Sequence, residues 1–339
     1  MTPAISFAHL FRLSDDIGLF RRALGSAPRR EHGYCVDDVA RGLVVLSREP
    51  SLLPELIRLL DLYLDFVLAA QAPDGMVANR RDSEGRWWDD PELGDCWGRA
   101  LWGLGTAAAL APTRRLRARA RAGFQVSAAR RSPWPRAMTF AALGAGELLL
   151  AHPDDEPART LLADAVTEIG PIKDDPGWPW PDPTLRYANA AVPEALILAG
   201  MCLSDRTAGA NGLRLLAWLL YVETRGDILS LTPVGGRRPR GDLRPGFDQQ
   251  PIEAAAIADA CARAHAATGQ RDWLTGLGQA HGWFLGENDA GTPLVDTTTG
   301  GCHDGLEPGG RNANQGAAAT LALLSTEQHA RRLLGSRTP

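Results

Sequence analysis

The chain has 339 residues, of which 45% are hydrophobic and 22% are charged, and its formal net charge at pH 7 is −4. This balance is typical of a globular protein. The negative charge disfavours nucleic acid or an anionic membrane as the main partner. No stretch is long and apolar enough to span a membrane, and no secretory signal opens the sequence. We therefore expect a soluble, cytoplasmic protein with no nucleic-acid partner and no membrane insertion.

Metal and nucleotide motifs are missing from the sequence. The seven histidines do not have HExxH spacing, and there is no P-loop, no GxGxxG after a strand and no GxSxG elbow. We expect no metal and no cofactor. Five widely spaced cysteines suit reduced thiols better than disulfides. Cys35, Cys96 and Cys302 lie near predicted helix starts, where buried filler and a thiol nucleophile are alternative roles.

Apolar residues recur with the helical period along most of the chain, and strand patterns are scarce. One set of predicted helices is amphipathic, with one stripe to bury and one charged face for water. These helices span 6–23, 53–71, 113–130, 156–170, 208–223 and 271–286.

A second set is nearly all small and apolar, which indicates helices buried on every side. These segments alternate with the first set and span 37–47, 96–111, 136–151, 189–204, 250–267 and 314–325. Six outer and six inner helices predict an all-α (α/α)6 toroid, a single domain over residues 1–339 with a disordered tail from about residue 330. An open solenoid of helix pairs is the alternative, but its repeat length is usually more uniform.

The predicted loops that lead into inner helices are long and rich in Gly, Pro and Trp, whereas those that lead out are short. The long loops span 72–95, 171–188, 225–248 and 287–313. This asymmetry gathers the elaborate loops on one face of the toroid, where functional residues concentrate.

Polar and aromatic residues gather at the inner-helix starts, which converge on one cavity in a toroid. Carboxylates there predict acid–base chemistry, for which the candidates are Asp38, Asp95 and Asp248. Flat aromatic rings beside amides and acids are suited to a sugar, whose ring has apolar faces and hydroxyl edges. The candidate substrate-binding residues are Tyr34, Asp37, Arg41, Trp97, Arg99, Trp180, Asp182, Tyr187, Asn189, Gln249, Gln250, Glu253, His303, Asp304, Asn314 and Gln315.

Structural roles are an alternative for many of these residues. Asp or Asn near a helix start is often an N-cap, which applies to Asp37, Asp95, Asn189 and Asp248. Arginines can pair with neighbouring acids, and tryptophans can be ordinary core. Capping does not explain two adjacent acids in "CVDD", or the recurrence of acids at five of the six starts.

Long motifs resemble a bacterial family of (α/α)6-toroid proteins that are six-hairpin glycosidase-like and often labelled glycosyltransferase-associated. The motifs are "HLFRLSDDIGLFRRA", "EHGYCVDDVARGL", "DCWGRALWGLG", "FDQQPIEAAAIADAC" and "GGCHDGLEPGGRNANQGAAATLALL". The resemblance implies action on a glycan, including a mannose-containing one, and a functional link to a glycosyltransferase. Val39, Ala188 and Ala318 depart from the acidic or amide residues of that pattern, which implies a changed substrate or weakened activity.

Three functions follow from these observations. The leading one is a glycoside hydrolase acting on a short oligosaccharide, with Asp38 in the chemistry and Asp95 or Asp248 as its partner. The second is a sugar epimerase or isomerase that uses His32 or His303 to move a proton. The third is a non-catalytic glycan-binding partner of a glycosyltransferase.

Overall fold

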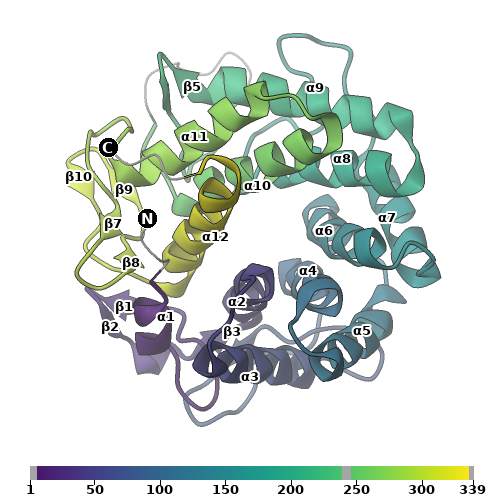
Figure 1. The fold of residues 1–339 in the computed structure, drawn as a ribbon, viewed down its shortest axis with the longest axis vertical. Coiled ribbons are helices and arrows are strands. Elements are labelled where there is room, and N and C mark those ends of the chain that lie inside the picture. The colour runs from purple at the N-terminus through teal and green to yellow at the C-terminus, as the bar shows by residue number, and fades with distance from the viewer. Residues whose placement is uncertain (1–5, 239–245, 336–339) are drawn as a thin grey trace.

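The computed structural model describes residues 6–238 and 246–335. Within these ranges the helices form an inner and an outer ring, and the strands are short pairs (Figure 1). The inner ring comprises α2 (Val36–Arg48), α4 (Asp95–Leu110), α6 (Pro135–Ala151), α8 (Ala191–Leu203), α10 (Pro251–Thr268) and α12 (Ala317–Leu333). The outer ring comprises α1 (Ala8–Arg12), α3 (Pro54–Ala70), α5 (Arg114–Ala128), α7 (Glu156–Ile169), α9 (Arg206–Glu223) and α11 (Asp272–Leu285).

The inner ring is closed. Each inner helix contacts the next inner helix in chain order, and α12 returns to contact α2 (Figure 1). The predicted all-α (α/α)6 toroid is therefore confirmed, and an open solenoid is excluded for the described residues.

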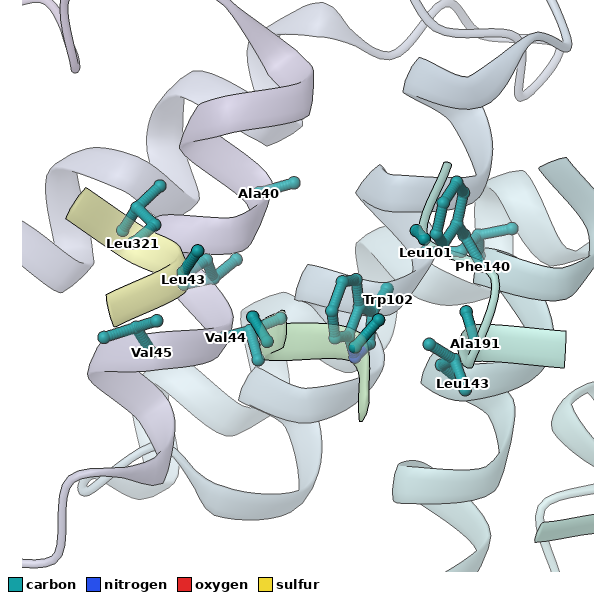
Figure 2. Close-up of a cluster of buried hydrophobic side chains, with 14 of the residues drawn as sticks. Ala40, Leu43, Val44, Val45, Leu101, Trp102, Phe140, Leu143, Ala191 and Leu321 are labelled. Atoms are coloured by element: carbon teal, nitrogen blue, oxygen red, sulfur yellow. The ribbon is translucent and has the colours of Figure 1, made fainter. Parts of the chain in front are cut away.

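Apolar side chains fill the middle of the inner ring. Val44, Trp102, Phe140, Leu143 and Leu321 extend into this space from four different inner helices (Figure 2). The rings of Trp102 and Phe140 stack with their centroids 6.3 Å apart. The inner helices bury one face against the outer ring and another against this central cluster. This burial on both faces explains why their sequences carry so few charged residues.

Glycines let α4 and α6 approach closely. A Cβ atom on Gly144 would lie 2.1 Å from the Leu101 carbonyl oxygen, and one on Gly105 would lie 2.1 Å from the Gly144 carbonyl oxygen. Real side chains do not tolerate such distances, so these two positions require glycine.

The first predicted helix, 6–23, is wrong in length, because α1 ends at Arg12. The Asp15 carboxylate accepts hydrogen bonds from the backbone N–H groups of Ile17 and Gly18, which holds the chain in a turn. Gly18 also packs closely against the Phe66 ring.

The last inner helix is longer than predicted, because α12 continues to Leu333. His329 contacts Asp259 and Arg331 contacts Glu49 at 2.8 Å, so the end of α12 is anchored to α10 and to the end of α2. Residues 336–339 of the predicted tail lie outside the described residues.

The strands form antiparallel pairs in the loops. They are β1 (Ala23–Leu24) with β2 (Ala27–Pro28), β3 (Tyr34–Cys35) with β4 (Arg80–Arg81), β5 (Thr224–Arg225) with β6 (Ile228–Leu229), β7 (Val295–Asp296) with β8 (Gly301–Cys302), and β9 (Leu306–Glu307) with β10 (Gly310–Arg311). The β3–β4 pair joins the entrances of α2 and α4.

Buried charges close the ring at the carboxyl end of α2. Arg48 lies 2.7 Å from Asp259 and 3.3 Å from Glu147. Arg263 lies 2.5 Å from Glu147, and His329 lies 2.6 Å from Asp259. This network links α2, α6, α10 and α12 at the end of the ring away from Asp37 and Asp38.

Candidate functional site

Three carboxylates line one cavity at the amino-terminal ends of the inner helices. The cavity has a volume of about 400 Å³, and we call it the acidic cavity. Its lining residues are Arg21, Arg22, Ala23, Arg29, Cys35, Asp37, Asp38, Gln250, Pro251, Ile252, Asp304, Asn314, Gly316, Ala318 and Ala319. The first turn of α2, the entrance to α10 and the loop before α12 meet at this cavity, whereas the starts of α4, α6 and α8, which were also expected to converge here, do not line it.

Asp38 is the most buried of these carboxylates, with 5% of its surface exposed. One oxygen lies 3.7 Å from Arg41, and the other accepts a hydrogen bond from the Cys35 thiol at 3.1 Å. Burial raises the pKa of Asp38, although Arg41 opposes the shift. Burial and the neighbouring Arg99 lower the pKa of Arg41 to about 10. Asp38 therefore holds a proton to higher pH than an ordinary aspartate.

Asp37 points away from Asp38, as adjacent helical residues must. It accepts a hydrogen bond from the Asn79 amide at 3.0 Å and lies 3.7 Å from Arg99 of α4. The Arg99 guanidinium also lies 3.9 Å from the centre of the Phe140 ring. Asp37 is thereby fixed between α2 and α4.

Asp304 reaches the acidic cavity from the loop before α12. Its carboxylate accepts a hydrogen bond from the Gly316 N–H at 2.6 Å. Burial raises the pKa of Asp304, and the negative charge of Asp38 adds to the shift. The charge of Asp38 therefore acts on Asp304 within the cavity that both residues line.

Side-chain capping does not account for these acids. In the described part of the chain, no inner helix has a side-chain hydrogen bond at its N-cap. Outer helices α5, α7 and α9 do, from Thr113, Asp155 and Asp205. The capping alternative is thus wrong for Asp37 and Asp95, which lie inside their helices.

A second cavity of about 410 Å³ lies beside the first and shares Gln250 with it. Glu253 and Tyr187 also line it. Glu253 accepts hydrogen bonds from the N–H groups of Ala188 and Asn189, and it holds Ala188 at a φ of 46°. Burial and the nearby charge of Glu223 raise the pKa of Glu253 to about 8, despite these donors. Glu253 thus shapes the loop before α8.

Asp95 belongs to a separate group of contacts. It accepts a hydrogen bond from the Tyr187 hydroxyl, and Arg136 lies over the Tyr187 ring at 5.4 Å. Burial lowers the pKa of Arg136, whereas nearby charges that include Asp182 and Asp95 oppose this. Asp95 does not line the acidic cavity.

Several predicted sugar contacts are core residues instead. Tyr34, Trp97 and Trp180 have no exposed surface. Tyr34 donates its hydroxyl to Asp15 and stacks on Phe20, and the Trp97 indole N–H donates to the Ser127 carbonyl. Trp180 stacks on Trp218 of α9. None of the three can present a ring face to a ligand in the cavity.

Other predicted residues serve the loops. Gln249 bonds to Trp283 and Asp289, Gln315 bonds to Asp296 and Thr299, and the buried Asn189 accepts from the Arg186 N–H. Asp248 is exposed and lies outside the acidic cavity. The expectation that Asp248 is the catalytic partner of Asp38 is therefore wrong. Asn314 lines the acidic cavity and accepts from the Gly25 N–H.

His303 and the departures from the family pattern have mixed positions. The His303 Nδ1 atom contacts the Asn312 carbonyl oxygen at 2.7 Å, and its Nε2 atom is buried with no partner in the described structure. Of the departures, Val39 is core, Ala188 is buried, and Ala318 is exposed in the acidic cavity.

The cysteines beside the helix starts are buried, and burial raises the pKa of Cys35, Cys96 and Cys302, which disfavours a thiolate nucleophile.

Sequence reasoning missed Arg21 and Arg22, because they fell inside a segment predicted to be helical. They precede β1 and line the acidic cavity.

Among the described residues, no group of three or more His, Cys, Asp or Glu side chains is arranged to hold a metal ion. None of the described helices combines the length and apolar character needed to cross a bilayer.

The fold defines the class of architecture: the chain is an (α/α)6 toroid, closed by an inner ring of six helices. Solved structures with this fold include a sugar epimerase from a ruminal bacterium, with a TM-score of 0.70 and 13% identity over 96% of this chain and 95% of that chain. Cellobiose 2-epimerase from Bacillus thermoamylovorans matches with a TM-score of 0.70 and 10% identity over 95% of both chains. The cellulase Cel9M of C. cellulolyticum, in complex with cellobiose, matches with a TM-score of 0.62 and 10% identity over 94% of this chain and 88% of that chain. No family model and no curated sequence matches.

Proposed function

We propose that this protein is a glycoside hydrolase acting on a short oligosaccharide. The observation that carries the proposal is the convergence of Asp37, Asp38 and Asp304 on one cavity of about 400 Å³. Proteins that share the fold include sugar epimerases and a cellulase, which supports a carbohydrate substrate. We further propose a mannose-containing glycan as the substrate and a functional link to a glycosyltransferase, both from the sequence resemblance. A cytoplasmic location is also a proposal.

Glycoside hydrolysis requires one carboxylic acid that protonates the leaving oxygen and one carboxylate that attacks carbon or activates water. We assign the acid to Asp38, because burial raises its pKa and so preserves its proton. Asp304 is the second carboxylate, because it is only partly buried and can reach water. Asp304 replaces Asp95 and Asp248 as the proposed partner, since neither of those lines the cavity.

The remaining cavity residues suit a sugar's hydroxyl groups. Gln250 and Asn314 each carry an amide that can both donate and accept hydrogen bonds. Asp37, fixed by Arg99 and Asn79, adds an acceptor. These groups are proposed to orient the substrate between Asp38 and Asp304.

A sugar epimerase is the second candidate, and His303 favours it. A proton on Nδ1, donated to the Asn312 carbonyl, leaves Nε2 as the basic nitrogen. Burial lowers the pKa of His303, which suits a neutral base. However, the lining of the acidic cavity includes Asp304 and not His303.

Proton NMR in D₂O with manno- and gluco-oligosaccharides separates these functions. We expect new anomeric signals from a shortened sugar, and the first anomer to appear distinguishes inversion from retention. Deuterium incorporation at a ring carbon without shortening would instead establish epimerisation. Line broadening of a sugar that never reacts would show that the protein only binds glycans.

A further inference from the structure

Arg21 and Arg22 are held beside the acidic cavity by their backbone. The Arg21 N–H donates to the Gly33 carbonyl at 3.1 Å, and its carbonyl accepts from the Ala317 N–H at 3.3 Å. The Arg22 carbonyl accepts from the Arg29 N–H at 2.8 Å. Because the main chain makes these contacts, the two guanidinium groups are not needed to hold the segment in place.

The two side chains face the carboxylates without touching them. Arg21 acts electrostatically on Asp38, and Arg22 acts on Asp304. Yet neither arginine side chain forms a hydrogen bond or ion pair with any part of the chain that the structure describes. Both arginines therefore line the acidic cavity without forming an ion pair with its carboxylates.

The carboxylates of the acidic cavity already have other partners, so Arg21 and Arg22 add positive charge that is not required to neutralise them. Asp37 already faces Arg99 at 3.7 Å, Asp38 faces Arg41 at 3.7 Å, and Asp304 accepts the Gly316 N–H at 2.6 Å. Arg29, the third arginine of the lining, is paired with Glu31 at 2.7 Å. The chain as a whole is acidic, with a net charge of −4, so general basicity does not explain the surplus.

We propose that the substrate of this cavity is an anionic saccharide, whose carboxylate or phosphate group is bound by Arg21 and Arg22. Guanidinium groups match these planar or multidentate anions, and their charge-assisted hydrogen bonds are stronger than neutral ones. The bound anion would occupy the acidic cavity, which both arginines line. This inference rests on the proposed hydrolase function, because it names the substrate class of the same site.

Calorimetric titration with paired probes tests the proposal. The probes are methyl glucuronide against methyl glucoside, and mannose 6-phosphate against mannose. We expect at least one anion to bind tighter than its neutral partner, and the tighter of the two identifies a carboxylate or a phosphate. The R21Q/R22Q variant should lose about 10- to 100-fold in affinity for that anion while its affinity for the neutral sugar stays unchanged.

The matched control is R58Q/R114Q, which removes two exposed arginines from outer helices α3 and α5. It should bind the anionic probe like the wild type. Equal affinity for charged and neutral probes, or equal affinity of R21Q/R22Q and wild type for the anion, would overturn the proposal. If the anion preference is confirmed but Asp38→Asn leaves sugar turnover unchanged, the hydrolase assignment fails and the anion site stands.

Discussion

Arg48 and Asp259 form an ion pair across the inner ring, with Arg48 at the end of α2 and Asp259 in α10. The two helices are separated by α12 in the ring, so the pair spans its lumen. Burial alone would raise the pKa of Asp259, but Arg48 and the hydrogen bond from His329 hold it below its usual range. Asp259 is therefore ionised at neutral pH and depends on Arg48.

Arg48→Met should lower the free energy of unfolding by about 3–5 kcal/mol, because it leaves Asp259 and Glu147 buried beside one fewer cation. Urea unfolding measures this. The control is Arg58→Met, which removes an exposed arginine 3.6 Å from Glu55 and should cost less than about 1 kcal/mol. Similar losses for both variants would show that the buried network does not stabilise the ring.

Asp38→Asn and Asp304→Asn should each lower kcat by about 10²- to 10⁴-fold, because each removes an acid or base from the proposed mechanism. Initial rates on the oligosaccharide found by NMR measure this, and circular dichroism checks that both variants fold. Asp154→Asn is the control, since Asp154 is exposed in the α6–α7 loop. Wild-type rates in both cavity variants would exclude the assignment.

Gly144→Ala should destabilise the protein by at least about 1–3 kcal/mol, because the new Cβ atom would lie 2.1 Å from the Leu101 carbonyl oxygen. Gly278→Ala is a matched change in α11, where a Cβ atom meets nothing within 4 Å. It should stabilise by about 0.5–1 kcal/mol, since alanine favours the helix. Thermal unfolding compares the two, and equal shifts would contradict the close approach of α4 and α6.

Glu253 should make stability depend on pH. Its folded pKa of about 8 exceeds the unfolded value of 4.5, so the folded state binds more protons between these values. Stability therefore falls as pH rises through this window, by at most about 1.4 kcal/mol per pH unit. Glu253→Gln should remove this slope in unfolding measured at pH 5, 6.5 and 8.

Glu84→Gln provides the comparison, because Glu84 is exposed on the surface. It should keep the wild-type pH slope. A constant difference between Glu253→Gln and wild type at all three pH values would show that Glu253 does not retain its proton on folding.

Sequence patterns predicted the fold well, because long apolar and amphipathic segments differ strongly in composition. Inner helices such as α4 and α10 were placed within one or two residues of their observed ends. The segment 6–23 was wrong, because the Asp15 turn competes locally with the helical period. A single acid with two backbone donors outweighs an otherwise helical pattern.

The site was harder to predict than the fold. The sequence placed Asp37, Asp38 and Asp304 among the site candidates, and all three line the acidic cavity. Its other catalytic candidates, Asp95 and Asp248, do not line it. The sequence could not reveal that Trp97 points toward α5, since an all-apolar helix has no sequence signal for which face meets the lumen. Arg21 and Arg22 were missed for another reason, because their approach to the cavity depends on long-range backbone contacts with Gly33 and Ala317.

The strict alternation of outer and inner helices makes all inner helices point the same way. Their peptide dipoles are therefore parallel, with partial positive ends at the acidic cavity and partial negative ends at the opposite side. Arg48 and Arg332 lie in the last turns of α2 and α12, where their positive charges interact favourably with the negative ends of the helix dipoles. At the other end, the backbone itself contributes a positive potential that any negatively charged molecule approaching the cavity would encounter.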